Sequence, residues 1–154
     1  MLLVKTTVKS SAIAGVGLFA DQDIKKGDII WKYTSETCNV FTQEQFQILL
    51  ESFHKTEKEL VRYYLTYSYY QRYLNGIVLC LDNGRFVNHS DEPKLGGPSH
   101  LAPEVAWQYS VALRDIKKGE ELTENYNTYD SSEWLDDLCQ EYQVYHFQPQ
   151  MTSA

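Results

Sequence analysis

The segment Arg85-Phe-Val-Asn-His-Ser90 holds the densest group of side chains that could do chemistry. The amide of Asn88 offers both a donor and an acceptor, and the imidazole of His89 can act as either. Such side chains bind a polar ligand, or they satisfy buried backbone groups inside a fold. Taken alone, the segment indicates either a binding site or a structural hydrogen-bond cluster.

A second segment, Gly15-Val16-Gly17, could bring the backbone close to a ligand or another strand, because glycine lacks a Cβ atom. With the following Leu-Phe-Ala it fits the G-x-G-x-x-A form of a dinucleotide fingerprint. That fingerprint needs a helix directly after the glycines, whose dipole faces the pyrophosphate. Residues 21–27 predict a turn instead, which argues against a nicotinamide-binding oxidoreductase. A chain dominated by helices would revive that alternative.

A third segment, Gly119-Glu-Glu-Leu-Thr-Glu-Asn-Tyr126, ends in a tyrosine beside acidic residues. On its own it predicts an edge strand with a solvated run of charges. The 3 cysteines and 4 histidines of the chain lack the spacing of metal ligands. We therefore expect neither a metal site nor a disulfide framework.

The composition restricts the partners and the compartment. The 154 residues suit a single domain, and the net charge of −7 disfavours nucleic acid as the main ligand while attracting basic peptides. The apolar start is too short for a secretory signal, and no apolar run approaches the ~18 residues of a membrane span. We expect an intracellular, cytoplasmic protein, or a nuclear one in a eukaryote, without membrane contact. A monomer and a homodimer both remain open.

Strand-forming residues recur in short runs, at 2–8, 28–33, 69–74, 77–81 and 105–113. The pair Asn75-Gly76 between two of these runs predicts a hairpin. No long helices alternate with the strands, so a doubly wound sheet is not indicated. The pattern predicts a mostly β (α+β) domain of small sheets.

Helical spacing of apolar residues predicts two helices at about 42–54 and 56–67, which form one helical insertion. Each begins with a capping-box pattern, at Thr42-x-x-Gln45 and at Thr56-x-x-Glu59. A further short helix is expected at 133–142, and the proline-rich residues 91–104 are expected to form a loop.

One turn occurs twice, as Asp23-Ile-Lys-Lys-Gly27 and as Asp115-Ile-Lys-Lys-Gly119. The segments around the two copies do not otherwise match. We therefore interpret them as two copies of one favourable turn, not as a duplicated domain.

The three segments Gly15-x-Gly17, Arg85–Ser90 and Gly119-Glu-Glu-Leu-x-x-x-Tyr126, taken in this order, resemble the SET-domain protein-lysine methyltransferases. Arg-Phe-Val-Asn-His-Ser is the most specific of them. The resemblance implies a SET domain over residues 1–127 with the helical insertion at about 42–67. It also implies several small sheets and a pseudoknot-like crossing of the C-terminal segment, an unusual topology.

The resemblance further implies S-adenosylmethionine as the cofactor and a protein or peptide with a target lysine as the substrate. Gly15, Val16 and Gly17 would contact the cofactor, chiefly through their backbone. Asn88 and His89 would bind its amino-acid portion and its adenine edge.

By the same resemblance, Tyr126 takes the position of the catalytic tyrosine, while Tyr33 and Glu124 would line the lysine channel. Methyl transfer is an in-line displacement, in which positioning of the reactants makes the largest contribution. The substrate amine, whose ordinary pKa is ~10.4, must lose its proton. A tyrosine-lined, apolar channel beside a cationic cofactor would lower that pKa.

The chain departs from the family in three ways. Asp91-Glu-Pro93-Lys94 stands where Cys-x-Pro-Asn is common, and Glu124 stands where many histone-directed members carry Phe or Tyr. That position limits how many methyl groups fit, and a carboxylate there either contacts the substrate ammonium or points away. Both the degree of methylation and the specificity for histones therefore stay open. The cysteine-rich zinc segment after many SET domains is absent. The alternative to an enzyme is a non-catalytic SET module that binds basic peptides.

Without a zinc segment, another part of the chain must cover the cofactor. We expect residues 128–154 to be a flanking segment that acts as a lid, with an aromatic ring stacked on adenine. The available rings are Trp134, Tyr142, Tyr145 and Phe147. The alternative is a C-terminal helix that packs on the core.

Overall fold

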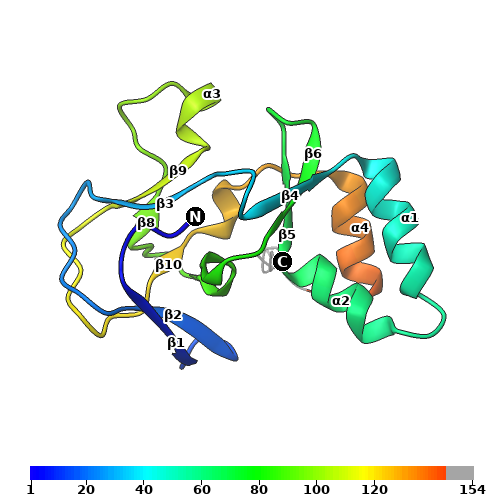
Figure 1. Cartoon of the computed structure of the whole chain (residues 1–154), viewed down its shortest axis with the longest axis horizontal. Coiled ribbons are helices and arrows are strands. Elements are labelled where there is room, and N and C mark those ends of the chain that lie inside the picture. Colours follow the sequence, from blue (N-terminus) through cyan, green and yellow to red (C-terminus); the bar gives the residue numbers. More distant parts are fainter. Residues whose placement is uncertain (145–154) are drawn as a thin grey trace, which may run out of the picture. The chain divides into compact units, whose positions relative to one another are not determined.

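The computed structural model describes residues 1–144, and in this part of the chain several small sheets accompany a few helices (Figure 1). This confirms the expected mostly β (α+β) fold. The chain forms two compact units. Unit 1 comprises Met1–Cys38 and Cys80–Asn125, and unit 2 comprises Asn39–Leu79 and the residues from Tyr126 onward.

Unit 1 contains three small sheets around one apolar core. Its elements are β1 (Thr6–Ser10), β2 (Val16–Ala20), β3 (Ile29–Lys32), β7 (Asn88–His89), β8 (Leu95–Gly96), α3 (Pro103–Ala106), β9 (Tyr109–Ala112) and β10 (Thr123–Glu124). β1 and β2 form an antiparallel pair, β9 lies between β3 and β8, and β7 pairs with β10. The fully buried side chains of the core are Leu18, Ile24, Ile30, Leu95, Ile116 and Leu122.

The first strand differs from its expected position at 2–8. β1 begins at Thr6, whereas the residues before it run beside β3. Leu2 forms a bridge with Trp31, and the Leu3 amide donates to the Ile30 carbonyl at 2.9 Å. One apolar run is thus divided between two partners, a division that strand propensity alone does not reveal.

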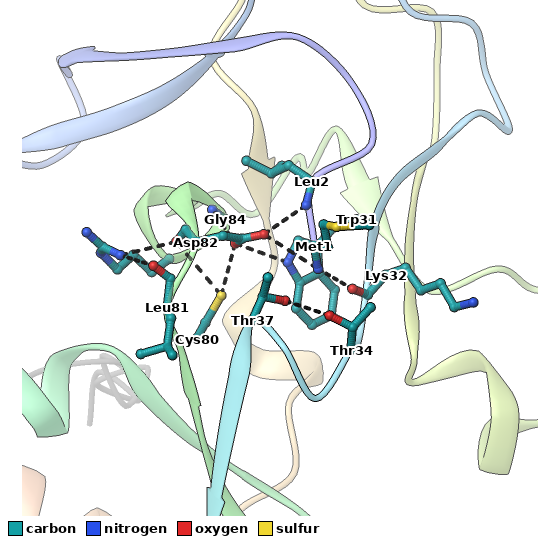
Figure 2. Close-up of polar contacts among 11 residues, drawn as sticks. Met1, Leu2, Trp31, Lys32, Thr34, Thr37, Cys80, Leu81, Asp82 and Gly84 are labelled. Atoms are coloured by element: carbon teal, nitrogen blue, oxygen red, sulfur yellow. Dashed lines mark hydrogen bonds and ion pairs between the residues drawn. The ribbon is translucent and has the colours of Figure 1, made fainter.

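The carboxylate of Asp82 joins this N-terminal segment to β3 and to the chain after β6 (Gly76–Cys80) (Figure 2). It accepts hydrogen bonds from the Leu2 amide at 2.8 Å, the Gly84 amide at 2.9 Å and the Trp31 indole at 3.3 Å. The Cys80 thiol donates to it at 3.2 Å. Burial raises the pKa of Asp82, but these hydrogen bonds outweigh burial and lower it, so the carboxylate stays charged.

The region 91–113 contains more structure than the expected loop and strand. β8 lies within the expected loop, and α3 precedes a shorter strand, β9. Pro103 occupies the first turn of α3, where its missing N–H group costs nothing. The Trp107 indole then donates to the Glu104 carbonyl at 2.9 Å, which closes the turn before β9.

The two Asp-Ile-Lys-Lys-Gly turns bind one another within unit 1. Ile24 and Ile116 exchange two backbone hydrogen bonds, each of 2.9 Å. Each turn closes on a glycine in the left-handed region, Gly27 with φ of +90° and Gly119 with φ of +93°. The repeated sequence therefore makes one reciprocal contact between equivalent residues 92 positions apart.

The aspartates complete this contact symmetrically. Asp115 accepts from the Lys26 amide and Asp23 accepts from the Lys118 amide, both at 2.9 Å. These backbone hydrogen bonds are the largest of the effects that lower the pKa of both carboxyls below its ordinary value. The folded state therefore favours the charged form of both groups.

Unit 2 consists of a helical part and a three-stranded sheet with the order β4-β6-β5. Its further elements are β4 (Cys38–Phe41), α1 (Gln43–Phe53), α2 (Lys58–Thr66), β5 (Ser68–Gln71) and α4 (Glu133–Glu141). Its core is formed by Phe46, Leu50, Val61, Leu65, Ile77, Leu135, Cys139 and Val144. The longest of the described helices has 11 residues, and none is long and apolar enough to cross a membrane.

Of the two expected capping boxes, one forms. Thr42 Oγ1 accepts from the Gln45 amide at 3.1 Å, and the Gln45 side chain accepts from the Thr42 amide at 2.9 Å. The box expected at Thr56 is wrong, because α2 begins later and has no side-chain cap. The amides of Thr56 and Glu57 donate to the Phe53 carbonyl instead, so this segment completes the end of α1.

The hairpin expected around Asn75-Gly76 is confirmed, with a longer turn. β5 and β6 pair antiparallel from Ser68 opposite Leu79 to Gln71 opposite Gly76. Residues 72–75 form the turn, and Asn75 has a left-handed φ of 44°. A Cβ atom on Gly76 would lie 3.0 Å from the Phe41 carbonyl oxygen, so this glycine allows the close approach of β4.

The reciprocal turns generate a pH prediction for the variant Asp23→Asn/Asp115→Asn. Because folding lowers both pKa values, the two carboxylates stabilise the protein above the ordinary Asp pKa of about 3.9, and this stability is lost as the pH falls through the lower folded values. The variant should therefore unfold at a lower urea concentration at pH 7, and its midpoint should change less between about pH 5 and pH 3.

Urea unfolding of the wild type, this variant and Asp137→Asn checks the prediction. Asp137 is an exposed residue of α4 and serves as the control. Identical pH slopes for the double variant and the wild type would contradict the role given to the two turns.

Candidate functional site

The Asn88-His89 segment lies beside the segment that precedes Tyr126 in the sequence. β7 and β10 pair in parallel, with Asn88 opposite Thr123 and His89 opposite Glu124. The Ser90 amide continues the pairing by donating to the Glu124 carbonyl at 2.9 Å. Parallel neighbours need a long crossover connection, and here 33 residues separate the two strands. After this long connection the chain crosses back to lie beside β7.

The glycine segment, Gly15–Gly17, comprises the end of the turn after β1 and the first two residues of β2, and it comes close to residue 121. Gly15 has a left-handed φ of +46° and faces open space, since a Cβ atom there would meet nothing within 4 Å. Gly17 is buried, and a Cβ atom on it would lie 2.1 Å from Oε1 of Glu121. The two glycines thus have different functions: one permits the turn, and the other permits a close approach.

Asn88 ties this glycine segment to β7. Its side-chain Nδ2 donates to the carbonyls of Val16 at 3.1 Å and Ala14 at 3.3 Å, and to Oε1 of Glu121 at 2.8 Å. Three acceptors converge on one amide nitrogen. The Asn88 nitrogen therefore satisfies backbone carbonyl groups, as expected of a structural hydrogen-bond cluster. These carbonyls belong to the segment that is expected to bind the cofactor.

Glu121, which the motifs of the sequence do not single out, contacts both Asn88 and the residues before the glycine segment. Its Oε1 and Oε2 accept from Ser11 Oγ at 2.7 and 3.0 Å. The neighbouring Glu120 bonds instead to the Lys117 amide at 2.7 Å and to Arg114 at 3.1 Å. The Gly-Glu-Glu-Leu motif indicates an acidic residue before β10, but it does not show which of its two glutamates faces the glycine segment.

His89 and the two unusual residues after it take part in local contacts. The imidazole Nε2 lies 3.3 Å from Oδ1 of Asp91, and the side chain is 38% exposed. Lys94, which replaces the common Asn, is mostly buried and donates from Nζ to the Glu121 carbonyl at 2.8 Å. Lys94 therefore holds the segment that leads into β10.

The two residues expected in the substrate channel both contact residues in or next to β9. Glu124 Oε1 accepts a short hydrogen bond from the hydroxyl of Ser110 on β9. Tyr33 follows β3, its amide donates to the Gln108 carbonyl at 2.8 Å, and its ring lies 5.0 Å from that of Trp107. Burial raises the pKa of Tyr33, so its hydroxyl is neutral at pH 7.

Tyr126 is the first residue of unit 2 and follows unit 1 directly in the chain. It begins a short 3-10 turn, Tyr126–Thr128, and its ring stacks on Tyr129 at 5.5 Å. Tyr129 also contacts Tyr69 at 5.6 Å. The tyrosine is therefore half-buried among other tyrosines of its own unit.

The described aromatic residues of the flanking segment pack within unit 2. Trp134 lies edge-on to Phe46, with 6.3 Å between the ring centroids, and Tyr142 packs against the same core. These contacts match the alternative of a C-terminal helix that packs on the core. The other two candidates for the lid, Tyr145 and Phe147, lie outside the described residues.

The exposed backbone at Gly15 and Val16 leaves room for a ligand that binds through backbone groups. Val16 is 43% exposed, the Cα of Gly15 faces open space, and the imidazole of His89, which follows Asn88 on β7, is 38% exposed. A side chain at Gly15 would fill that space. Among residues 1–144, no group of three His, Cys, Asp or Glu side chains is placed to hold a metal ion.

The sequence comparisons identify related proteins. The family model for the SET domain matches residues 15–127. A variant-silencing SET domain-containing protein of Plasmodium falciparum is 31% identical over 126 residues, which is 78% of this chain. A histone-lysine N-methyltransferase of Mycosarcoma maydis, H3 lysine-36 specific, is 33% identical over 115 residues, or 73% of this chain. The matched parts are 5% and 11% of the length of these relatives.

Solved structures show the same fold. Polycomb Repressive Complex 2 of Chaetomium thermophilum, in an autoinhibited conformation bound to S-adenosylmethionine, aligns with a TM-score of 0.60 at 21% identity. The alignment covers 90% of this chain and 17% of that one. A SET domain protein of Neurospora, a histone lysine methyltransferase, aligns with a TM-score of 0.55 at 20% identity, over 85% of this chain and 55% of the other.

The close approach of Gly17 to Glu121 generates a stability prediction. In Gly17→Ala the new methyl group displaces the carboxylate, which should lower the free energy of unfolding by about 1–3 kcal/mol. Gly97→Ala is the matched control, because a Cβ atom there meets nothing within 4 Å. Urea unfolding measures both variants. Equal stabilities would show that Gly17 tolerates a side chain.

Proposed function

Because the chain belongs to the SET-domain family, we propose that it transfers a methyl group from S-adenosylmethionine to the side-chain amine of a lysine in a protein substrate. The observation that carries the proposal is the parallel pair of β7 and β10, with Asn88 bonded to the glycine segment. The hydrogen bonds of Asn88 to the carbonyls of Ala14 and Val16 support the assignment of the glycine segment and of β7 to one cofactor site.

Within this proposal, Gly15, Val16 and Gly17 hold the cofactor through their backbone, and Asn88 and His89 complete its binding site. When bound, the cofactor supplies a methyl group on a cationic sulfur. The protein must keep the cofactor in a fixed orientation, because an in-line displacement depends on alignment more than on any acid or base. A turn fixed by internal hydrogen bonds serves that purpose.

Tyr126 serves as the catalytic tyrosine in this proposal. Its hydroxyl accepts a hydrogen bond from the neutral lysine amine and directs the nitrogen lone pair. Tyr33 contributes a neutral, half-buried ring to the wall of the lysine channel. A channel that is poor in water lowers the pKa of the incoming amine and so favours its reactive form.

A basic protein tail is the substrate class that the charge favours. The net charge of −7 attracts lysine-rich segments and repels phosphate. Several relatives carry the name of histone-lysine methyltransferases with H3 lysine-36 specificity. We therefore propose histones as the first substrates to test, together with a whole-cell extract as a source of other proteins.

Transfer of labelled methyl groups to these substrates tests the function. We expect the wild type to label protein lysines and Tyr126→Phe to do so about 100-fold more slowly, with similar cofactor affinity, because only a hydroxyl is lost. Tyr73→Phe is the control, since Tyr73 is an exposed tyrosine of unit 2.

The outcomes separate the alternatives. Equal rates for Tyr126→Phe and the wild type would contradict the catalytic assignment. A wild type that binds basic peptides without labelling any protein would favour the non-catalytic SET module.

Glu124 generates a second prediction, on the pH dependence of transfer. A carboxylate in the channel stabilises the charged form of the substrate amine and raises its pKa. In Glu124→Gln this effect is lost, so the rising limb of the rate should move to lower pH by on the order of one unit. The exposed Glu92 of the same unit provides the control, Glu92→Gln. Superimposable profiles for all three proteins would place Glu124 outside the channel.

A further inference from the structure

We propose that Glu121 is a positioning residue that holds the glycine segment in the conformation that binds the cofactor. The proposal rests on the function proposed above, in which Gly15, Val16 and Gly17 contact S-adenosylmethionine. Glu121 itself contacts no reacting group in this scheme. It acts through the residues that surround the glycine segment.

The first support is a series of hydrogen bonds that begins at the carboxylate. Ser11 Oγ donates to Glu121 and, with its lone pairs, accepts from the amides of Ile13 at 2.9 Å and Ala14 at 3.4 Å. The Ser11 amide donates to the Gly15 carbonyl at 3.0 Å. Glu121 therefore orients the hydroxyl that fixes the start of the turn.

The second support is the shared amide of Asn88. Nδ2 reaches Glu121 and also the carbonyls on either side of Gly15. The carboxylate thus fixes the orientation of the amide that holds the middle of the turn. Hydrogen bonds to a charged acceptor are stronger than neutral ones, so a carboxylate suits this position better than an amide or hydroxyl.

The third support is the contact at the end of the turn. The space that a Cβ atom of Gly17 would need contains the Glu121 carboxylate, with Oε1 2.1 Å from that position. The backbone of this glutamate is itself held by the pairing of Phe19 with Glu121 and by the hydrogen bond of 2.7 Å from the Leu122 amide to the Leu18 carbonyl. One side chain therefore supports the start, the middle and the end of the segment.

The physical consequence is preorganisation. Residues 12–16 are exposed and belong to no strand before Val16, so without support they would sample many conformations. A segment that is ordered before the ligand arrives avoids the entropy loss of ordering on binding. Removal of the carboxylate should therefore weaken the binding of the cofactor more than it changes the transfer step.

The experiment compares Glu121→Ala, Glu121→Gln and the control Glu120→Ala. Amide hydrogen exchange in the cofactor-free protein reports on residues 12–17, and calorimetry with S-adenosylhomocysteine reports the Kd. For Glu121→Ala we expect exchange at least about tenfold faster in this segment and a Kd at least about tenfold higher. Glu121→Gln keeps one acceptor oxygen but loses the charge, so its exchange and Kd should lie between those of Glu121→Ala and the wild type, whereas the control should remain within about threefold of the wild type.

Each outcome decides the proposal. Unchanged exchange and unchanged Kd in Glu121→Ala would overturn it. Exchange that is equally faster in β3 and β9 would show a general structural role and would also overturn it. A wild type that does not bind S-adenosylhomocysteine would contradict the proposed function, whereas the exchange data would still decide whether Glu121 orders the segment.

A double variant provides a second test. If the methyl group of Gly17→Ala acts by displacing the carboxylate, the Kd penalty of this substitution should fall severalfold in the Glu121→Ala background. Strictly multiplicative effects on Kd would show that the two residues act independently, against the proposal.

Discussion

The parallel pairing of β7 with β10 is the constraint on which the arrangement of unit 1 depends. Each strand has two residues, so the backbone alone offers few hydrogen bonds to hold the crossing. Side chains supply the remainder: Asn88 bonds across to Glu121, and Lys94 donates to the backbone carbonyl of the same glutamate. The glycine segment is attached to the same pair. Loss of the pairing would leave the contact between β7 and the glycine segment to the side chain of Asn88.

Three half-buried carboxylates link the short strands and loops of unit 1 to one another. Asp82 joins the N-terminal segment to β3, Glu121 joins the loop after β1 to β7, and Glu124 joins β10 to β9. Buried or half-buried acceptors of this kind are costly unless they are satisfied, so each specifies one arrangement of its donors. Some of the carboxylates that make the net charge negative thus have a structural function, while others are solvated at the surface.

The sequence predicted those features that depend on short local patterns or on a specific motif. The hairpin at Asn75, the capping box at Thr42 and the Asn-His-Ser segment were identified from residues within a few positions of one another. The failed box at Thr56 shows the limit of such signals, because the end of α1 uses the Thr56 amide that the box would need. The functions of Glu121 and Lys94, and the mutual binding of the two Asp-Ile-Lys-Lys-Gly turns, depend on contacts between distant segments that no local pattern encodes.

The central claim is that the glycine segment and β7 together form the cofactor site of a SET-domain protein. A crystal structure of the chain with S-adenosylhomocysteine tests it most directly. The ligand should lie against the backbone of Gly15–Gly17 and beside Asn88 and His89, with the hydrogen bonds of Glu121 intact. A ligand bound elsewhere, with this segment empty, would contradict the claim.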